Sequence, residues 1–129
     1  MPEEIIPRFE PHSHDCYSNL RLLDSTNRPE TLIRYAYDIG LKGIAVTNHE
    51  SLSNFVILDK LQEEYREIDD TFKIVRGNEI YLTDTRDKGQ YYYHHILLAL
   101  DSVGNKMLRE LSSNAWINSY YVRRYDRLW

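Results

Sequence analysis

The sequence predicts an α/β fold in which parallel strands are covered by helices. Short apolar segments typical of strands alternate with segments whose apolar residues recur at helical spacing, in the order β-α-β-α-β-β-α. A length of 129 residues suits one domain, and an apolar content of 42% with eleven Tyr, three Phe and two Trp can fill a modest core. The same alternation continued further would close a barrel, so these strands are expected to form the first part of one.

The amino-terminal part is expected to form a strand, a helix and a second strand. Phe9–His14 is the first strand, whose alternate side chains point to one face. Pro29 favours the opening turn of a helix, and Gly40 favours its C-terminal stop. Apolar residues recur between them at i, i+4 and i+7, as Leu32, Ala36 and Ile39. Gly43–His49 is short, apolar and β-branched, which is typical of a buried strand that ends at a histidine.

A second helix and a third strand are expected next. Ser51 or Ser53 can cap this helix. Its apolar stripe includes Leu58, Leu61 and Tyr65. Phe72–Leu82 has the composition of a strand, which we expect to be interrupted at Gly77.

The carboxyl-terminal part is expected to hold the fourth strand and the last helix. Asp84–Gln90 is a polar turn, and His94–Leu100 is the strand that follows it. A helix is expected around Met107–Ala115. Its apolar residues are Met107, Leu108, Leu111 and Ala115.

Charge and composition exclude several classes of protein. Sixteen Lys and Arg against twenty Asp and Glu give a net charge of −4, so bulk charge does not hold nucleic acid here. No apolar run approaches the roughly 18 residues of a membrane helix, and MPEEIIPRF lacks the basic start and apolar stretch of a signal peptide. The single cysteine, Cys16, forms no internal disulfide. We therefore expect a cytoplasmic protein with no membrane partner.

Histidine and carboxylate side chains lie at or near the ends of three expected strands. His12 and His14 project to one face of the first strand and can share one cation. His49 closes the second strand, and Glu79 lies within the third. These elements deliver their side chains to the edge where an α/β fold places its sites. Imidazole and carboxylate together suit Zn²⁺, Mn²⁺ or Fe rather than Ca²⁺, so the sequence predicts a metal cluster that a later histidine completes.

Five segments in this order resemble the polymerase and histidinol phosphatase (PHP) domain at the amino terminus of bacterial DNA polymerase III α subunits. They are PHSH, GIAVTNHESLS, RGNEIYLT, YYYHHILLAL and LRELSSNAW. The likeness runs from about Phe9 to Arg127, and the last segment resembles the α-subunit branch more than the free-standing phosphatases. The resemblance implies a partial PHP-type (β/α) barrel, made of the first strands and helices of a distorted seven-stranded barrel similar to a TIM barrel. Residues 1–129 would then form a single incomplete PHP domain.

The resemblance also implies a set of ligands for divalent ions. Carried over by motif, the metal ligands are His12, His14, Asp24, His49, Glu79 and His94. In the complete domain such ligands would hold two or three ions of Zn, Mn, Fe or Mg, with Glu79 and His49 assigned as catalytic. Asp24 has an alternative role, because an Asp before Ser25 and Thr26 can shape the turn that precedes the helix.

Three features limit this resemblance. His94 begins its strand, so it reaches the cluster only from an antiparallel strand or a turn, and His95 alternates to the other face. Asn48 stands where the family usually has Asp, which removes a charge beside His49. No histidine follows His95, so the later ligands of the family have no counterpart. We therefore expect the front part of a longer protein, or a truncated reading frame. The expected partners are the remainder of the polymerase chain and, through it, DNA.

The sequence favours one function and leaves two alternatives. The favoured function is a PHP segment of a replicative DNA polymerase III α subunit, with a metal-dependent phosphoesterase site that acts as a 3′–5′ exonuclease or a pyrophosphatase. One alternative is a catalytically inactive scaffold whose metal only stabilises the fold. The other is a free-standing PHP phosphoesterase acting on a small phosphate monoester. The tail SYYVRRYDRLW can stack bases and bind phosphate, although we favour its docking on the remainder of the fold.

Overall fold

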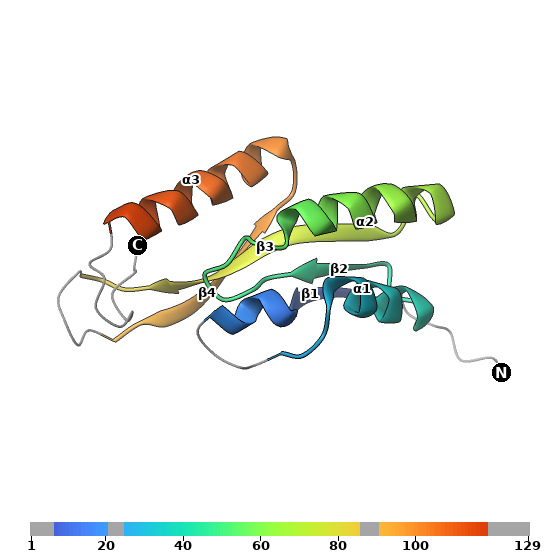
Figure 1. Ribbon diagram of the computed structural model, residues 1–129, viewed down its shortest axis with the longest axis horizontal. Helices are drawn as coiled ribbons and strands as arrows, with labels where there is room; N and C mark the ends of the chain where they lie inside the picture. Colours follow the sequence, from blue (N-terminus) through green and yellow to red (C-terminus); the bar gives the residue numbers. More distant parts are fainter. Residues whose placement is uncertain (1–6, 21–24, 86–90, 119–129) are drawn as a thin grey trace.

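The computed structural model of the chain describes residues 7–20, 25–85 and 91–118. Within these residues, four strands form one sheet with the strand order β1-β2-β3-β4, accompanied by helices (Figure 1). In chain order the elements are β1 (Phe9–Ser13), η1 (Cys16–Leu20), α1 (Pro29–Asp38), β2 (Gly43–Val46), α2 (Phe55–Ile68), β3 (Lys73–Leu82), β4 (Tyr93–Ala99) and α3 (Ser102–Asn118). This arrangement is the α/β class that the sequence predicts.

Three strands of the sheet are parallel, and the last one reverses. β1 pairs with β2 and β2 pairs with β3 in parallel, whereas β4 runs antiparallel to β3. The start of β4 therefore lies beside the end of β3, where His94 pairs with Tyr81. Of the two alternatives for His94, an antiparallel strand is the one observed.

Local signals account for both ends of α1. Pro29 occupies the first turn, where its missing N–H is not needed, and Glu30 lies near the positive end of the helix dipole. At the other end, the N–H of Gly40 bonds the Tyr37 carbonyl at 2.9 Å, and the N–H of Leu41 bonds the Ala36 carbonyl at 3.1 Å. This pair of bonds requires a left-handed residue between helix and strand, and Gly40 has φ +82°. The predicted start and stop of this helix are confirmed.

The main core lies between the sheet and the first two α-helices. It consists of Ile33, Ala36, Ile44, Val46, Leu58, Leu61, Phe72 and Ile74. On β3, Ile74 belongs to this core, and Ile80 on the same face lines a small cavity with Leu111 and Trp116 of α3. α2 and α3 therefore cover the same face of β3 (Figure 1). The opposite face of β3 carries Glu79.

Two expectations about the strands are corrected. β3 continues through Gly77 without interruption. A Cβ atom on Gly77 would lie 2.7 Å from Thr47 Cγ2 and 2.8 Å from the Leu97 carbonyl oxygen, so the glycine permits close packing instead of breaking the strand. β2 ends at Val46, before the expected end at His49, although His49 still makes an isolated parallel bridge with Glu79.

Expectations about the helices also need correction. Neither Ser51 nor Ser53 caps α2, because their hydroxyl groups bond each other at 3.1 Å and the N-cap residue is Asn54. α3 is longer than expected, and it buries Leu108 while Met107 remains 63% exposed. The short helix η1 has no helical periodicity in the sequence and was not expected. Residues 86–90 of the expected polar turn lie outside the described residues. None of the helices described combines the length and apolar character needed to cross a membrane.

Candidate metal centre

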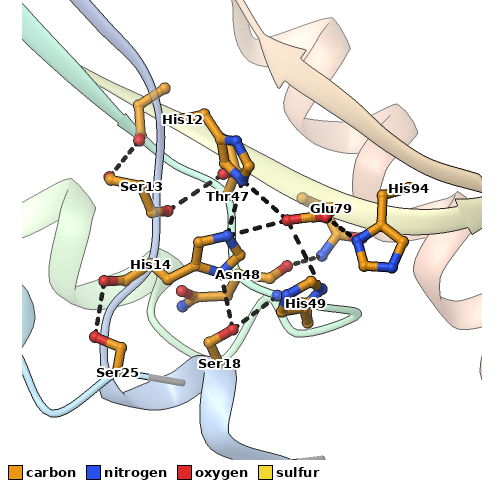
Figure 2. Close-up of polar contacts among 12 residues, drawn as sticks. His12, Ser13, His14, Ser18, Ser25, Thr47, Asn48, His49, Glu79 and His94 are labelled. Carbon is orange, nitrogen blue, oxygen red and sulfur yellow. Dashed lines mark hydrogen bonds and ion pairs between the residues drawn. The ribbon is translucent and has the colours of Figure 1, made fainter. Parts of the chain in front are cut away.

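The carboxylate of Glu79 lies at the centre of four histidine rings (Figure 2). Its side chain is only 4% exposed and projects from β3 on the face opposite α2 and α3. The histidines come from three other segments, which are β1 with the residue after it, the loop after β2, and β4. A buried carboxylate requires polar partners, and here imidazole rings supply them.

The first group of donors is formed by His12, His14 and Glu79. The Nε2 atoms of His12 and His14 lie 2.9 Å and 3.0 Å from Glu79 Oε2, and 2.8 Å from each other. A tetrahedral zinc ion with bonds of about 2.0–2.1 Å to nitrogen separates its ligand atoms by about 3.3 Å. The three atoms therefore need only a small outward shift to bind one ion.

The second group is formed by His49, Glu79 and His94. His49 Nδ1 lies 3.7 Å from Glu79 Oε2, and His94 Nδ1 contacts the other carboxylate oxygen, Oε1. One potential ligand atom from each of these residues falls within 4.8 Å of the others, as it does in the first group. Glu79 thus belongs to both groups and presents a different oxygen to His94 than to His12 and His14.

The surroundings of Glu79 determine its ionisation. Burial by itself raises the pKa of this carboxyl group, but the histidines act in the opposite direction. The hydrogen bond to His14, the charge of His49 and the hydrogen bonds to His12 and His94 lower the pKa of Glu79 from 4.5 to about 2. Glu79 is therefore a carboxylate at neutral pH, with both oxygens able to accept hydrogen bonds or bind a cation.

Two hydroxyl groups contact the histidine rings of the cluster, Ser18 at the far nitrogen of His14 and Tyr81 at the nitrogen of His49 that faces Glu79. Ser18 Oγ lies 2.9 Å from His14 Nδ1 and accepts the backbone N–H of His49 at 3.1 Å, so it lies between the two segments (Figure 2). The Nδ1 of His14 is thereby engaged, and its Nε2 faces Glu79. Tyr81 Oη lies 3.2 Å from His49 Nδ1, and the two rings stack with their centroids 5.7 Å apart.

Sequence reasoning missed both hydroxyl residues. Tyr81 had a usable signal, because it lies two residues after Glu79 in a strand and so projects to the same face. Ser18 had none, since it lies in the unexpected helix η1.

Three other residues considered from the sequence are not members of the two donor groups. Asp24 lies outside the described residues. His95 pairs with Ile80, on the face opposite to His94, so its exclusion agrees with the strand register. Cys16 is a half-buried free thiol.

Comparison with known families identifies this arrangement. The family model of the PHP domain matches residues 10–129. The chain belongs to the PHP domain family. The resemblance inferred from five sequence segments is thereby confirmed.

Proteins similar to this PHP domain include polymerases of bacteria and phages. It is 37% identical over 128 residues to the DNA-directed DNA polymerase of Bacillus phage SPbeta, covering 91% of this chain and 10% of that protein. It is 30% identical over 123 residues to DNA polymerase III subunit alpha of Treponema pallidum (strain Nichols), covering 89% of this chain and 10% of that protein. The PHP domain spans about one tenth of the length of these curated relatives.

A solved structure supports the fold of this PHP domain. It is a Bifidobacterium adolescentis protein described as a "putative metal-dependent phosphoesterase", with a TM-score of 0.57 and 24% identity. The match covers 84% of this chain and 33% of the other. The architecture is that of a partial β/α barrel, as the sequence predicts. The imidazole and carboxylate donors of this PHP domain suit a divalent metal ion.

Proposed function

We propose that this PHP domain is a segment of a replicative DNA polymerase III α subunit and that its cluster holds two divalent ions for hydrolysis of phosphoester bonds. One ion would be held by His12, His14 and Glu79, and the other by His49, Glu79 and His94. Asp24 is proposed as a further ligand. The observation that carries the proposal is the single buried carboxylate that takes part in both donor groups.

The side chains of the site have separate tasks in this proposal. Bound divalent ions supply the Lewis acidity that activates water and polarises a phosphoryl oxygen. Glu79 contributes the one negative charge among the described donors, and the four imidazoles contribute none when neutral. The filled site would therefore be strongly positive, which suits an anionic phosphate. His49 and Glu79, both buried, form the inner part of the site, whereas His12 is exposed at its rim, where substrate would enter.

The proposed substrates are a phosphodiester at a DNA 3′ end or pyrophosphate. The matched relatives are named as DNA polymerases, whose reaction extends a 3′ end and releases pyrophosphate. Hydrolysis of the first would make the domain a 3′–5′ exonuclease, and hydrolysis of the second would make it a pyrophosphatase. Its partners would be the remainder of the polymerase chain and DNA, in the cytoplasm.

Metal analysis of the purified chain tests the ligand assignment. We expect about two divalent ions per chain for the wild type. His14→Ala combined with Glu79→Ala should remove them, because each group loses its shared carboxylate. His95→Ala is the matched control, since it removes a neighbouring histidine from the opposite face and should leave the metal content unchanged. Equal metal content in all three proteins would overturn the assignment.

Activity measurements then separate the proposed substrates. The parent polymerase carrying this domain should be incubated with a 3′-mismatched primer, with pyrophosphate and with p-nitrophenyl phosphate. Hydrolysis of the primer or of pyrophosphate that is lost in the His14→Ala, Glu79→Ala protein supports the proposal. Hydrolysis of p-nitrophenyl phosphate alone would favour a phosphoesterase for small monoesters.

A structural role is a second candidate, because the cluster connects every strand of the described sheet. Glu79 in β3 is joined to histidines that follow β2 or lie in or beside β1 and β4. A metal bound there would stabilise the folded state against unfolding. A melting temperature that falls on chelation, with no hydrolysis of any of the three substrates, would favour this role.

A further inference from the structure

A buried polar network lies directly behind the candidate metal centre. Its members are Asp15, Asn48 and Asn54, whose exposures are 0%, 1% and 1%. Asp15 follows His14 in the chain, and Asn48 precedes His49. Asn54 is the N-cap residue of α2, but its side chain makes no capping bond to that helix.

The three side chains satisfy one another's hydrogen-bonding groups. Asp15 donates its backbone N–H to Asn48 Oδ1 at 2.9 Å, and Asn48 returns an Nδ2–H bond to Asp15 Oδ1 at 2.6 Å. Asn54 Nδ2 donates to Asp15 Oδ2 at 2.7 Å, and the backbone N–H of Tyr17 donates to Oδ1 at 2.8 Å. The buried carboxylate thus accepts three N–H bonds, which is the condition for tolerating a buried charge.

The carboxamide of Asn48 performs two tasks that a carboxylate could not combine. It must accept an N–H bond through one atom and donate to a carboxylate through the other. An aspartate at this position would accept the first bond but would face Asp15 with a second carboxylate. Asn48 itself carries no charge beside His49, as expected, but its side chain bonds the buried carboxylate of Asp15.

The same network is connected to the third element of the centre. The backbone carbonyl of Asn48 accepts the N–H of Glu79 at 3.1 Å and the side-chain amide of Asn78 at 2.8 Å. One residue thus contacts the segment that carries His14, precedes His49 in the chain and bonds the backbone of Glu79. The rings of His14 and His49, the neighbours in the chain of Asp15 and Asn48, lie with their centroids 4.6 Å apart.

We propose that Asp15 is a positioning residue that, through Asn48 and Asn54, sets the spacing between His14 and His49 and hence the geometry of the metal centre. The inference rests on the proposed metal binding. The Asp15 carboxylate bonds the side-chain amides of Asn48 and Asn54 and the backbone N–H of Tyr17, so its effect on the histidines is indirect. Outer partners of metal ligands typically change metal affinity by about 10–100-fold when they are removed.

An exchange of the two side chains tests this proposal. Mn²⁺ binding to the folded full chain should be measured by calorimetry for the wild type, Asp15→Asn, Asn48→Asp and the double exchange. We expect Asn48→Asp to weaken Mn²⁺ binding by about 10-fold or more. Asp15→Asn should weaken it less, because the amide retains one acceptor. The double exchange should bind Mn²⁺ more tightly than Asn48→Asp, because a carboxylate and a carboxamide again face each other.

Two further variants separate positioning from general stability. Gln62→Ala is the matched control, since Gln62 also bonds two backbone groups, those of Phe72 and Ile74, in the core region away from the metal centre. It should lower the free energy of unfolding without changing the dissociation constant for Mn²⁺. Asn54→Ala removes one bond to Asp15 and should also weaken Mn²⁺ binding. If the Asn48→Asp variant fails to fold, Asn54→Ala takes its place in the comparison.

The outcomes distinguish this inference from the proposed function. A wild-type chain that binds no Mn²⁺ overturns the proposed metal site, and the positioning role with it. A wild-type chain that binds Mn²⁺ while the network variants bind it equally well overturns the positioning role alone. Loss of affinity in the single variants with no recovery in the double exchange would contradict the matched pairing of Asp15 with Asn48.

Discussion

The part of the molecule from β1 to β3 differs sharply in packing from the part formed by β4 and α3. The first contains a core of eight buried apolar side chains, whereas the second contributes two residues, Ala99 and Leu108, to a cluster of three. Large apolar side chains also remain exposed in and around the second part, among them Leu100 at 86% and Ile117 at 78%. Glu79 and three of its four histidines belong to the well-packed part, and His94 comes from the other. The centre is therefore built mainly on the well-packed part, with one donor from a more weakly packed strand.

The largest effect is expected from breaking the first core. Phe72 is 1% exposed, and its ring contacts those of Tyr37 and Tyr65. Phe72→Ala should lower the free energy of unfolding by about 3–5 kcal/mol, because it removes buried apolar surface and leaves a cavity. Urea denaturation followed by circular dichroism measures this change. Leu108→Ala, in the smaller cluster, is the comparison, and a larger loss for Leu108→Ala than for Phe72→Ala would contradict the difference between the two parts.

The next effect is the pH dependence that Glu79 gives to the well-packed part. Its pKa is lowered from 4.5 to about 2 in the folded chain. A group with a lowered pKa stabilises the fold above its unfolded pKa, and this stabilisation is lost as the pH falls from about 4.5 towards 2. The loss should be on the order of 2–3 kcal/mol. Denaturation in the presence of a chelator measures it, and Glu79→Gln should flatten the curve in this window. An unchanged pH dependence in that variant would show that Glu79 is not the responsible group.

A smaller effect is expected from removing the one donor that β4 supplies. His94→Ala should lose the second metal ion and keep the first, because His12 and His14 remain with Glu79. The half-exposed His94 side chain contributes little to packing, so the free energy of unfolding without metal should change by less than about 1 kcal/mol. Metal content and denaturation in chelator give the two values. Loss of both ions would mean that the weakly packed strand controls the whole centre.

The smallest effect on stability is expected at the exposed face of α3. Val103 and Met107 are 62% and 63% exposed and lie one helical turn apart. Replacing both with Gln should change the free energy of unfolding by no more than about 0.5 kcal/mol for each residue. Because contiguous apolar surface promotes association, the variant should also self-associate less at high concentration, as measured by light scattering. Val56→Gln, exposed on α2, is the matched control in the well-packed part and should leave association unchanged.

Elements with local signals could be predicted from the sequence. The Pro29 start and Gly40 stop of α1 act within a few residues, so their outcome does not depend on the rest of the fold. Gly77 was misinterpreted because the reason for a glycine there is contact with Thr47 and Leu97, which are distant in the chain. The prediction that Ser51 or Ser53 caps α2 was also wrong. The N-cap residue is Asn54, whose side chain bonds Asp15, a residue distant in the chain, and does not cap the helix.

The donor residues of the candidate site could be predicted from the sequence, but the residues that hydrogen-bond the donor segments could not. Histidine and carboxylate residues at strand ends are conspicuous in a sequence, and the structure brings His12, His14, His49, Glu79 and His94 together. That these residues bind metal stays a prediction, as does the role of Asp24. Asp15 and Ser18 gave no signal, because their importance comes from partners more than thirty residues away in the chain.

The absence of a side chain at Gly77 limits which substitutions the candidate site can tolerate. A methyl group there would act as a wedge between Thr47 on one side and the neighbouring strand on the other, two residues before Glu79. Substitutions at this position would therefore disturb the placement of Glu79, although they alter none of the candidate metal ligands. Even alanine would be too large at Gly77, because one of the neighbouring groups is the backbone carbonyl of Leu97, which cannot turn aside as a flexible side chain could.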